Sequence, residues 1–121
     1  MAASPNPIVA SPDPFGFQYM ATFTATVTET AGVSGNIDSL IVTLHESQTN
    51  LDRFTIGFNP SDIQNRAGTN HIGAKGTLDV PISLHYNLTG SGRQATVIVG
   101  IILVDDFGHR INLPNVTLNV V

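Results

Sequence analysis

The sequence predicts an all-β domain, an antiparallel β-sandwich of seven to eight strands with at most one short helical turn near residues 60–66. Three observations predict this class. Apolar and polar residues alternate with a period of two, and turn residues recur about every 10–15 positions. Charged residues make up only 12 % of the chain, so threonine, asparagine, serine and glycine must build the surface. Strands with one apolar face bury that face by packing in two layers.

Three strands with one buried face each are expected in the first half of the chain. Residues 17–28 alternate between an apolar set that starts at Phe17 and a threonine-rich set that faces solvent. Two shorter alternations follow the turn at 30–36, and their apolar members predict two further buried faces. These members are Leu40, Val42 and Leu44 in the second strand, and Phe54, Ile56 and Phe58 in the third.

One short helical turn interrupts the strands near residues 60–66. Asn59 carries the side chain of a helix N-cap, and Pro60 suits the first helical position, where an N–H is not needed. Gly68 is expected to end the turn.

Two strands are expected in the second half of the chain, one with a single apolar face and one with two. Residues 77–88 alternate strictly, and Pro81 among them lacks an N–H, which favours an edge strand or a local break in pairing. Residues 95–104 are apolar on both faces. This pattern predicts a central strand that is covered on both sides, or one whose outer face meets a partner.

The segment ILVDDFGHRI, at positions 102–111, holds the densest group of ionisable side chains and predicts a hairpin turn. With a three-residue loop at 106–108, Leu103 faces Ile111 and the buried face continues, whereas an even loop would split that face. Gly108 suits the left-handed position of such a loop. Either of the two adjacent aspartates can accept hydrogen bonds from turn amides.

The strand after this turn requires one irregularity. Beyond residue 113 the apolar residues change parity, and the new set is Val116, Leu118 and Val120. One extra residue at 114–115, a β-bulge, restores their pairing with Val99, Val97 and Ala95.

The same turn raises a metal-binding alternative, a weak calcium contact at Asp105 and Asp106. Calcium usually takes six to eight oxygen ligands, and the loop offers two carboxylates without a third acid nearby. We therefore expect a capped turn rather than a metal site. No other metal and no cofactor are predicted.

The first sixteen residues contain four prolines, which favours extended chain. We expect residues 1–16 to be a linker, or alternatively an arm that pairs with a neighbouring subunit, and residues 17–121 to be the folded domain. The chain ends at Val121 inside an apolar alternation, which is typical of a module from a longer protein.

Composition and missing motifs argue against most enzymes and several partners. The net charge is −4 with only five Lys and Arg residues, so no basic stripe is available for nucleic acid, and no apolar run is long enough to insert in a membrane. Cysteine is absent, and no nucleophile elbow, phosphate-binding loop or metalloprotease motif occurs. The four histidines are scattered, and His45 and His85 fall on the polar parity of their strands. We expect no catalytic residues.

The segments ETAGVSGNIDSLIVTL, GTLDVPISLHYNL and ILVDDFGHRI together resemble the bacterial Ig-like and fibronectin-III-like modules of secreted and cell-surface proteins. The resemblance covers residues 17–121 and implies an Ig-like sandwich with a non-catalytic, extracellular role in spacing or adhesion, with neighbouring domains or subunits as partners. The cysteine and tryptophan signature of antibody-type domains is absent.

Two alternatives to a spacer or adhesion module stay open at this point. The first is a self-assembling fibre or pilus subunit joined by strand addition through the N-terminal arm. The arm around Ile8 and the two-sided apolar strand at 95–104 motivate it. The second is a carbohydrate-binding module, which would use exposed aromatics such as Phe15 or Phe107. Asn87 and Asn115 stand in glycosylation sequons, for which chance is the better explanation in so Asn- and Thr-rich a chain.

Overall fold

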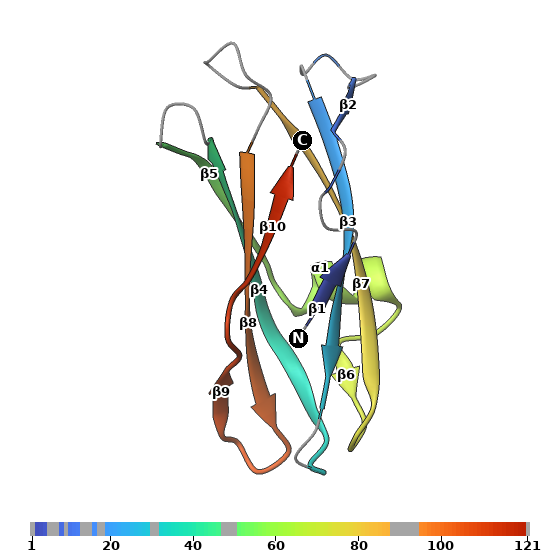
Figure 1. The fold of residues 1–121 in the computed structure, drawn as a ribbon. Helices are drawn as coiled ribbons and strands as arrows, with labels where there is room; N and C mark the ends of the chain where they lie inside the picture. Colours follow the sequence, from blue (N-terminus) through green and yellow to red (C-terminus); the bar gives the residue numbers. More distant parts are fainter. Residues whose placement is uncertain are drawn as a thin grey trace.

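The computed structural model describes residues 2–4, 8, 10–12, 16, 19–29, 32–46, 51–87 and 95–120 (Figure 1). Ten strands and one helix lie in these ranges. They are β1 (Ala2–Ser4), β2 (Ser11–Pro12), β3 (Tyr19–Thr28), β4 (Gly35–Glu46), β5 (Leu51–Phe58), α1 (Pro60–Ala67), β6 (His71–Ile72), β7 (Thr77–Tyr86), β8 (Ala95–Asp105), β9 (Arg110–Asn112) and β10 (Val116–Val120).

The strands form two antiparallel sheets that face each other, so the predicted all-β sandwich is confirmed (Figure 1). In the first sheet, β3 pairs with β7 along one side and with the short strands β1 and β2 along the other. In the second sheet the order is β10-β8-β4-β5, with β6 added to β4 and β9 added to β8. Four of the ten strands are only two or three residues long, which accounts for the smaller number of strands that alternation predicts.

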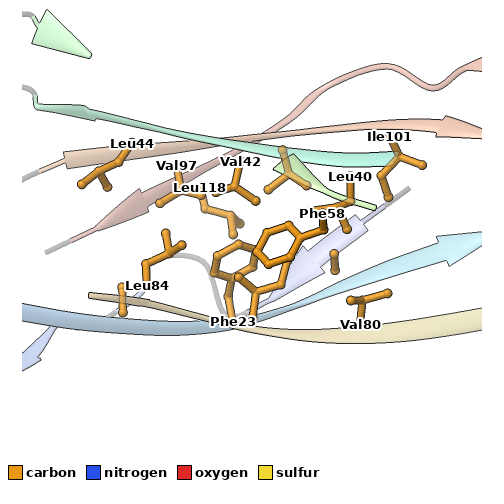
Figure 2. Close-up of a cluster of buried hydrophobic side chains, with 14 of the residues drawn as sticks. Phe23, Leu40, Val42, Leu44, Phe58, Val80, Leu84, Val97, Ile101 and Leu118 are labelled. Atoms are coloured by element: carbon orange, nitrogen blue, oxygen red, sulfur yellow. The ribbon is translucent and has the colours of Figure 1, made fainter. Parts of the chain in front are cut away.

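The core lies between the two sheets and consists of the apolar residues that alternation selects. Figure 2 shows Phe23 and Leu84 of the first sheet pointing toward Val42 and Leu118 of the second. Each of these side chains is at most 1 % exposed. The helix adds Ile63, which is fully buried.

The helix has the ends that the sequence predicts. The Asn59 side chain accepts a hydrogen bond from the Asp62 amide at 2.8 Å, and the Asp62 carboxylate accepts one from the Asn59 amide at 3.1 Å. This reciprocal pair is a capping box. Pro60 occupies the first turn, and Gly68, in the left-handed conformation at φ 88°, ends the helix.

The strand that contains Pro81 and the strand that is apolar on both faces lie at the predicted positions in the sheets. Within the described residues β7 pairs with β3 alone, so Pro81 lies in an edge strand. β8 lies between β4 on one side and β9 and β10 on the other, so it is a central strand.

The hairpin that follows β8 has the predicted register. Leu103 pairs with Ile111 across a loop at residues 106–108, and Gly108 has a φ of 86°. After β9 the register shifts by one residue, so that Val116 pairs with Val99, as a bulge at 114–115 requires.

The N-terminal segment, for which the sequence predicts a linker or an arm up to residue 16, lies on the sandwich in its described parts. Ala2–Ser4 pair with β3, and the Ile8 amide donates to the Asn119 carbonyl at 2.7 Å in a parallel bridge to Val120. Ile8 is 1 % and Ala10 is 3 % exposed. Prolines are compatible with an edge segment, and its apolar residues bury themselves as an ordinary strand would. An arm that pairs with another subunit would first have to leave these contacts.

Candidate functional site

Three turns meet at one end of the sandwich, at the bottom of Figure 1. They connect β3 to β4, β6 to β7, and β8 to β9. We call this region the turn end and define it by the described residues 29, 32–34, 73–76 and 105–109. It contains the two aspartates that the sequence singles out and one acid that sequence reasoning missed.

Asp105 caps the β8–β9 turn. Its Oδ1 accepts hydrogen bonds from the amides of Phe107 at 2.9 Å and His109 at 2.8 Å, and its Oδ2 lies 3.3 Å from Nδ1 of His109. The carbonyl of Asp105 accepts from the Gly108 amide at 2.9 Å. The turn-capping role predicted for this pair of aspartates is thus carried by Asp105.

These contacts lower the pKa of Asp105. The largest cause is the hydrogen bond from the His109 amide, and the Phe107 amide and the His109 ring act in the same direction. Partial desolvation opposes them. A carboxyl group whose pKa is lower in the folded than in the unfolded protein stabilises the fold above its unfolded pKa, and this stabilisation is lost as the pH falls through the folded pKa.

We therefore expect the variant Asp105→Asn to have a lower melting temperature than the wild type at pH 6. The difference between the two should begin to shrink only below the ordinary aspartate pKa of about 3.9, where the unfolded chain takes up the proton, and it should vanish at a lower pH still, because the lowered pKa keeps Asp105 ionised in the folded protein. Thermal unfolding between pH 2 and pH 6 measures it, with Asp106→Asn as the matched control. A melting-temperature difference that is constant over this pH range would contradict the capping role.

Asp106 points to a different partner. Its carboxylate accepts a hydrogen bond from the hydroxyl of Ser34, and its amide donates to the Ser34 carbonyl at 3.0 Å. Asp106 therefore fastens the β8–β9 turn to the β3–β4 turn, while Asp105 serves its own turn. A cation at this loop would have to compete with those donors. In the described ranges no group of three or more His, Cys, Asp or Glu residues is placed to hold a metal ion.

Glu29 is the acid that sequence reasoning missed. It is 7 % exposed, and its Oε2 accepts hydrogen bonds from the amides of Gly32 at 2.9 Å and Lys75 at 2.8 Å. Its own amide donates to the Gly76 carbonyl at 2.9 Å. Glu29 thereby joins the β3–β4 turn to the β6–β7 turn. A usable signal exists in the sequence, because Glu29 continues the buried parity of Phe23, Ala25 and Val27.

A small cavity of about 110 Å³ opens beside Glu29. Apart from Thr28, its other walls are apolar and include Ile72, Leu103 and Ile111. Ile111 is 39 % exposed and forms part of the rim. A cavity of this size is well below the usual range of about 300–1,000 Å³ for pockets that bind small molecules.

The remaining candidate side chains, with the exception of Phe107, lie apart from the turn end. His45 and Glu46 point to opposite faces of β4: Nδ1 of His45 lies 2.8 Å from the carboxylate of Asp52, and Glu46 is fully buried. His85 lies on the outer face of the first sheet, as its parity predicts. Phe107 is 75 % exposed at the tip of its turn, whereas Phe15 falls outside the described residues. Of the candidate histidines, only His109 therefore lies near the two aspartates.

Comparison with known proteins places the chain by fold alone. No protein-family model matches it, and neither does any curated protein. Among solved structures, the chain is similar to the X-ray structure of Northeast Structural Genomics Consortium target SoR45, with a TM-score of 0.71 and 8 % identity over 97 % of this chain and 82 % of that one. At this identity the likeness shows a shared fold.

A second solved structure matches at a lower level. It is the Pseudomonas fluorescens alkylpurine DNA glycosylase AlkC bound to DNA containing an abasic site analog, with a TM-score of 0.46 and 12 % identity. The match covers 98 % of this chain but only 30 % of the glycosylase. A likeness of this degree bears on neither fold nor function. No helix among the described residues has the length and apolar character needed to cross a membrane.

Proposed function

We propose that this chain is a non-catalytic, Ig-like or fibronectin-III-like module that acts as a spacer or adhesion unit in a larger extracellular protein, with neighbouring domains or subunits as its partners. Three strand positions in one sheet, β1-β3-β7, face four in the other, β10-β8-β4-β5. This division supports the Ig-like assignment, because sandwiches of that class divide about seven antiparallel strands in the same way.

The N-terminal segment is the observation that carries the proposal. β1 pairs antiparallel with β3 in one sheet, and six residues after Ala2 the chain makes a parallel bridge from Ile8 to Val120 at the edge of the other sheet. The first and last segments of the domain are thus directly hydrogen-bonded to each other.

This arrangement suits a domain that carries load between its two ends. Ala2 lies beside Thr26, whereas Val120 lies beside Ala95 near the opposite end of the sandwich (Figure 1). A pull on the two ends therefore acts along the strands, and bonds sheared along a strand must break together. Bonds that are unzipped across a strand break one after another and resist less force.

Single-molecule force spectroscopy tests this role. We expect unfolding through the two termini to require a higher force than unfolding between a Thr96→Cys attachment and the C-terminus, which unzips β10 from β8 because Thr96 pairs with Asn119. The chain contains no cysteine, so the introduced thiol is a unique attachment point. An equal or lower force through the termini would contradict a load-bearing spacer.

A further inference from the structure

Over Phe54–Phe58, β5 lacks the devices that block pairing with another chain; its two charged residues, Asp52 and Arg53, and the register shift opposite them lie at its N-terminal end. Edge strands are usually protected by shortness, proline, charge or a covering segment. In the described residues β7 carries Pro81, β1 and β2 are three and two residues long, and Ile8 bridges to β10. β5 is eight residues long and lacks proline, and among the described strands it pairs with β4 alone (Figure 1).

The hydrogen bonds within the second sheet fix which backbone groups of β5 face outward. The Ile101 carbonyl accepts from the Leu113 amide, so the odd residues of β8 point away from β4 and the even residues point toward it. Gly100, which points toward β4, pairs with Ile41. The odd residues of β4 from 39 to 45 therefore point toward β8, and the even residues 40–44 point toward β5.

The same alternation continues into β5. Val42 pairs with Ile56, so the amide and carbonyl of Ile56 bond to β4, while those of Thr55 and Gly57 point to the open edge. Both Thr55 and Gly57 are exposed, and an added Cβ at Gly57 would meet no atom within 4 Å. The edge thus presents two donors and two acceptors in strand geometry.

Ile56 supplies an apolar contact at the same place. It lies on the face of the sheet that elsewhere is buried, because its partner Val42 is fully buried. Ile56 itself is 38 % exposed, since no further strand continues the sheet beyond β5 among the described residues. A strand added beside β5 would cover this side chain.

We propose that β5 is a strand-addition site whose partner is β5 of a second copy of this chain, in an antiparallel pair about a two-fold axis. In the register that places Ile56 opposite Ile56 of the second copy, the outward amides and carbonyls of Thr55 and Gly57 all find hydrogen-bond partners. Thr55 then exchanges hydrogen bonds with Gly57 of the second copy, and the reverse pair repeats them. Ile56 is at the non-bonded position between these pairs, where the two backbones approach to about 4.5 Å and side chains are in closest contact.

Charge and sequence favour a second copy as the partner. The segment Phe54–Phe58 contains no charged residue, so the two copies bring no like charges together across the axis. Asp52 lies outside the paired segment and is already in contact with His45. The pairing ends at the helix, where Pro60 offers no N–H. The interface is closed by its two-fold symmetry, unlike a fibre built through the N-terminal arm.

Sedimentation and light scattering of the full chain test the proposal. From about 1 µM to about 1 mM, we expect the mass to rise from 12.8 kDa to twice that value and no further. Gly57→Pro removes an outward N–H and should hold the mass at 12.8 kDa, whereas Gly57→Ala keeps that N–H and should dimerise as the wild type does. The amides of Thr55 and Gly57 should exchange more slowly with solvent at the higher concentration.

Two further variants separate pairing from folding. Ser83→Pro places a proline two residues after Pro81 on the other edge, where it should leave dimerisation unchanged. Ile56→Lys should also abolish the dimer, and it decides the matter if Gly57→Pro fails to fold. A wild type that stays at 12.8 kDa over the whole range, masses beyond the dimer, or a folded Gly57→Pro that dimerises normally would each overturn the proposal.

Discussion

Deleting residues 1–14 is expected to lower the free energy of unfolding by about 4 kcal/mol, although the segment has the composition of a linker. Ile8 is 1 % exposed, so its removal loses a fully buried side chain and leaves a gap beside Val120. The backbone bonds from β1 to β3 and from Ile8 to Asn119 are lost with it. A loss of this size in a domain of 121 residues corresponds to a melting temperature lower by about 15 °C.

Thermal and denaturant unfolding of the full and the truncated chain measure the effect. The point variant Ile8→Ala in the full chain should show about half of it, because the strand pairing of β1 is retained. An unchanged melting temperature after the deletion would mean that the segment is a linker. The same two proteins also test the fibre alternative, because assembly that does not depend on residues 1–14 would exclude the arm as the joining element.

The hairpin from β8 to β10 could be predicted to the residue from sequence alone. Its buried face is continuous only with a three-residue loop at 106–108 and one extra residue at 114–115, and both are present. The helix was equally well specified, because Asn59, Pro60 and Gly68 act locally. In both cases the information lies within a few residues of the feature it determines.

The N-terminal strand and the buried acids were harder to predict because distant residues determine them. The prolines of the first sixteen residues conceal a short alternation of Ile8 and Ala10, whose burial depends on β10 and β3. Glu29 and Glu46 each continue the buried parity of a strand, but an acid at a strand end is ordinarily exposed. The partners that make Glu29 buried come from two turns, one of them 46 residues away.

The exposure of Ile56 at the open edge of β5 could not be predicted from local patterns either. Alternation places Ile56 in the core together with Phe58, yet Phe58 is 6 % and Ile56 is 38 % exposed. The difference arises because Arg66 of α1 lies 4.7 Å from the centre of the Phe58 ring, whereas no described strand lies beyond β5 to cover Ile56. Both conditions depend on the tertiary arrangement and not on the pattern of the strand itself. A second copy paired along β5 would give Ile56 the burial that its sequence pattern predicts.

Replacing Glu29 by alanine is expected to lower the free energy of unfolding by about 3 kcal/mol. The Glu29 carboxylate accepts from the amides of Gly32 and Lys75, and both of these residues have a positive φ, 86° and 56° respectively. The left-handed conformation costs a residue such as Lys75 about 1 kcal/mol, so the hydrogen bond to Glu29 holds a backbone that would otherwise relax. Without the carboxylate, two turn amides lose their acceptor and the two turns lose their connection.

Denaturant unfolding measures the loss, and amide exchange at Gly32 and Lys75 locates it. Glu29→Gln keeps one side-chain acceptor oxygen for the two amides but loses the negative charge that strengthens both hydrogen bonds, so it should show about half the effect of Glu29→Ala. Asp52→Ala, at an acid whose side chain is 65 % exposed, controls for the loss of one negative charge and should change stability by less than about 1 kcal/mol. If Glu29→Ala were no less stable than Asp52→Ala, the hydrogen bonds by which Glu29 connects the two turns would not contribute to the free energy of unfolding. The turn end would then have to be held by the Asp106 contact to Ser34 instead.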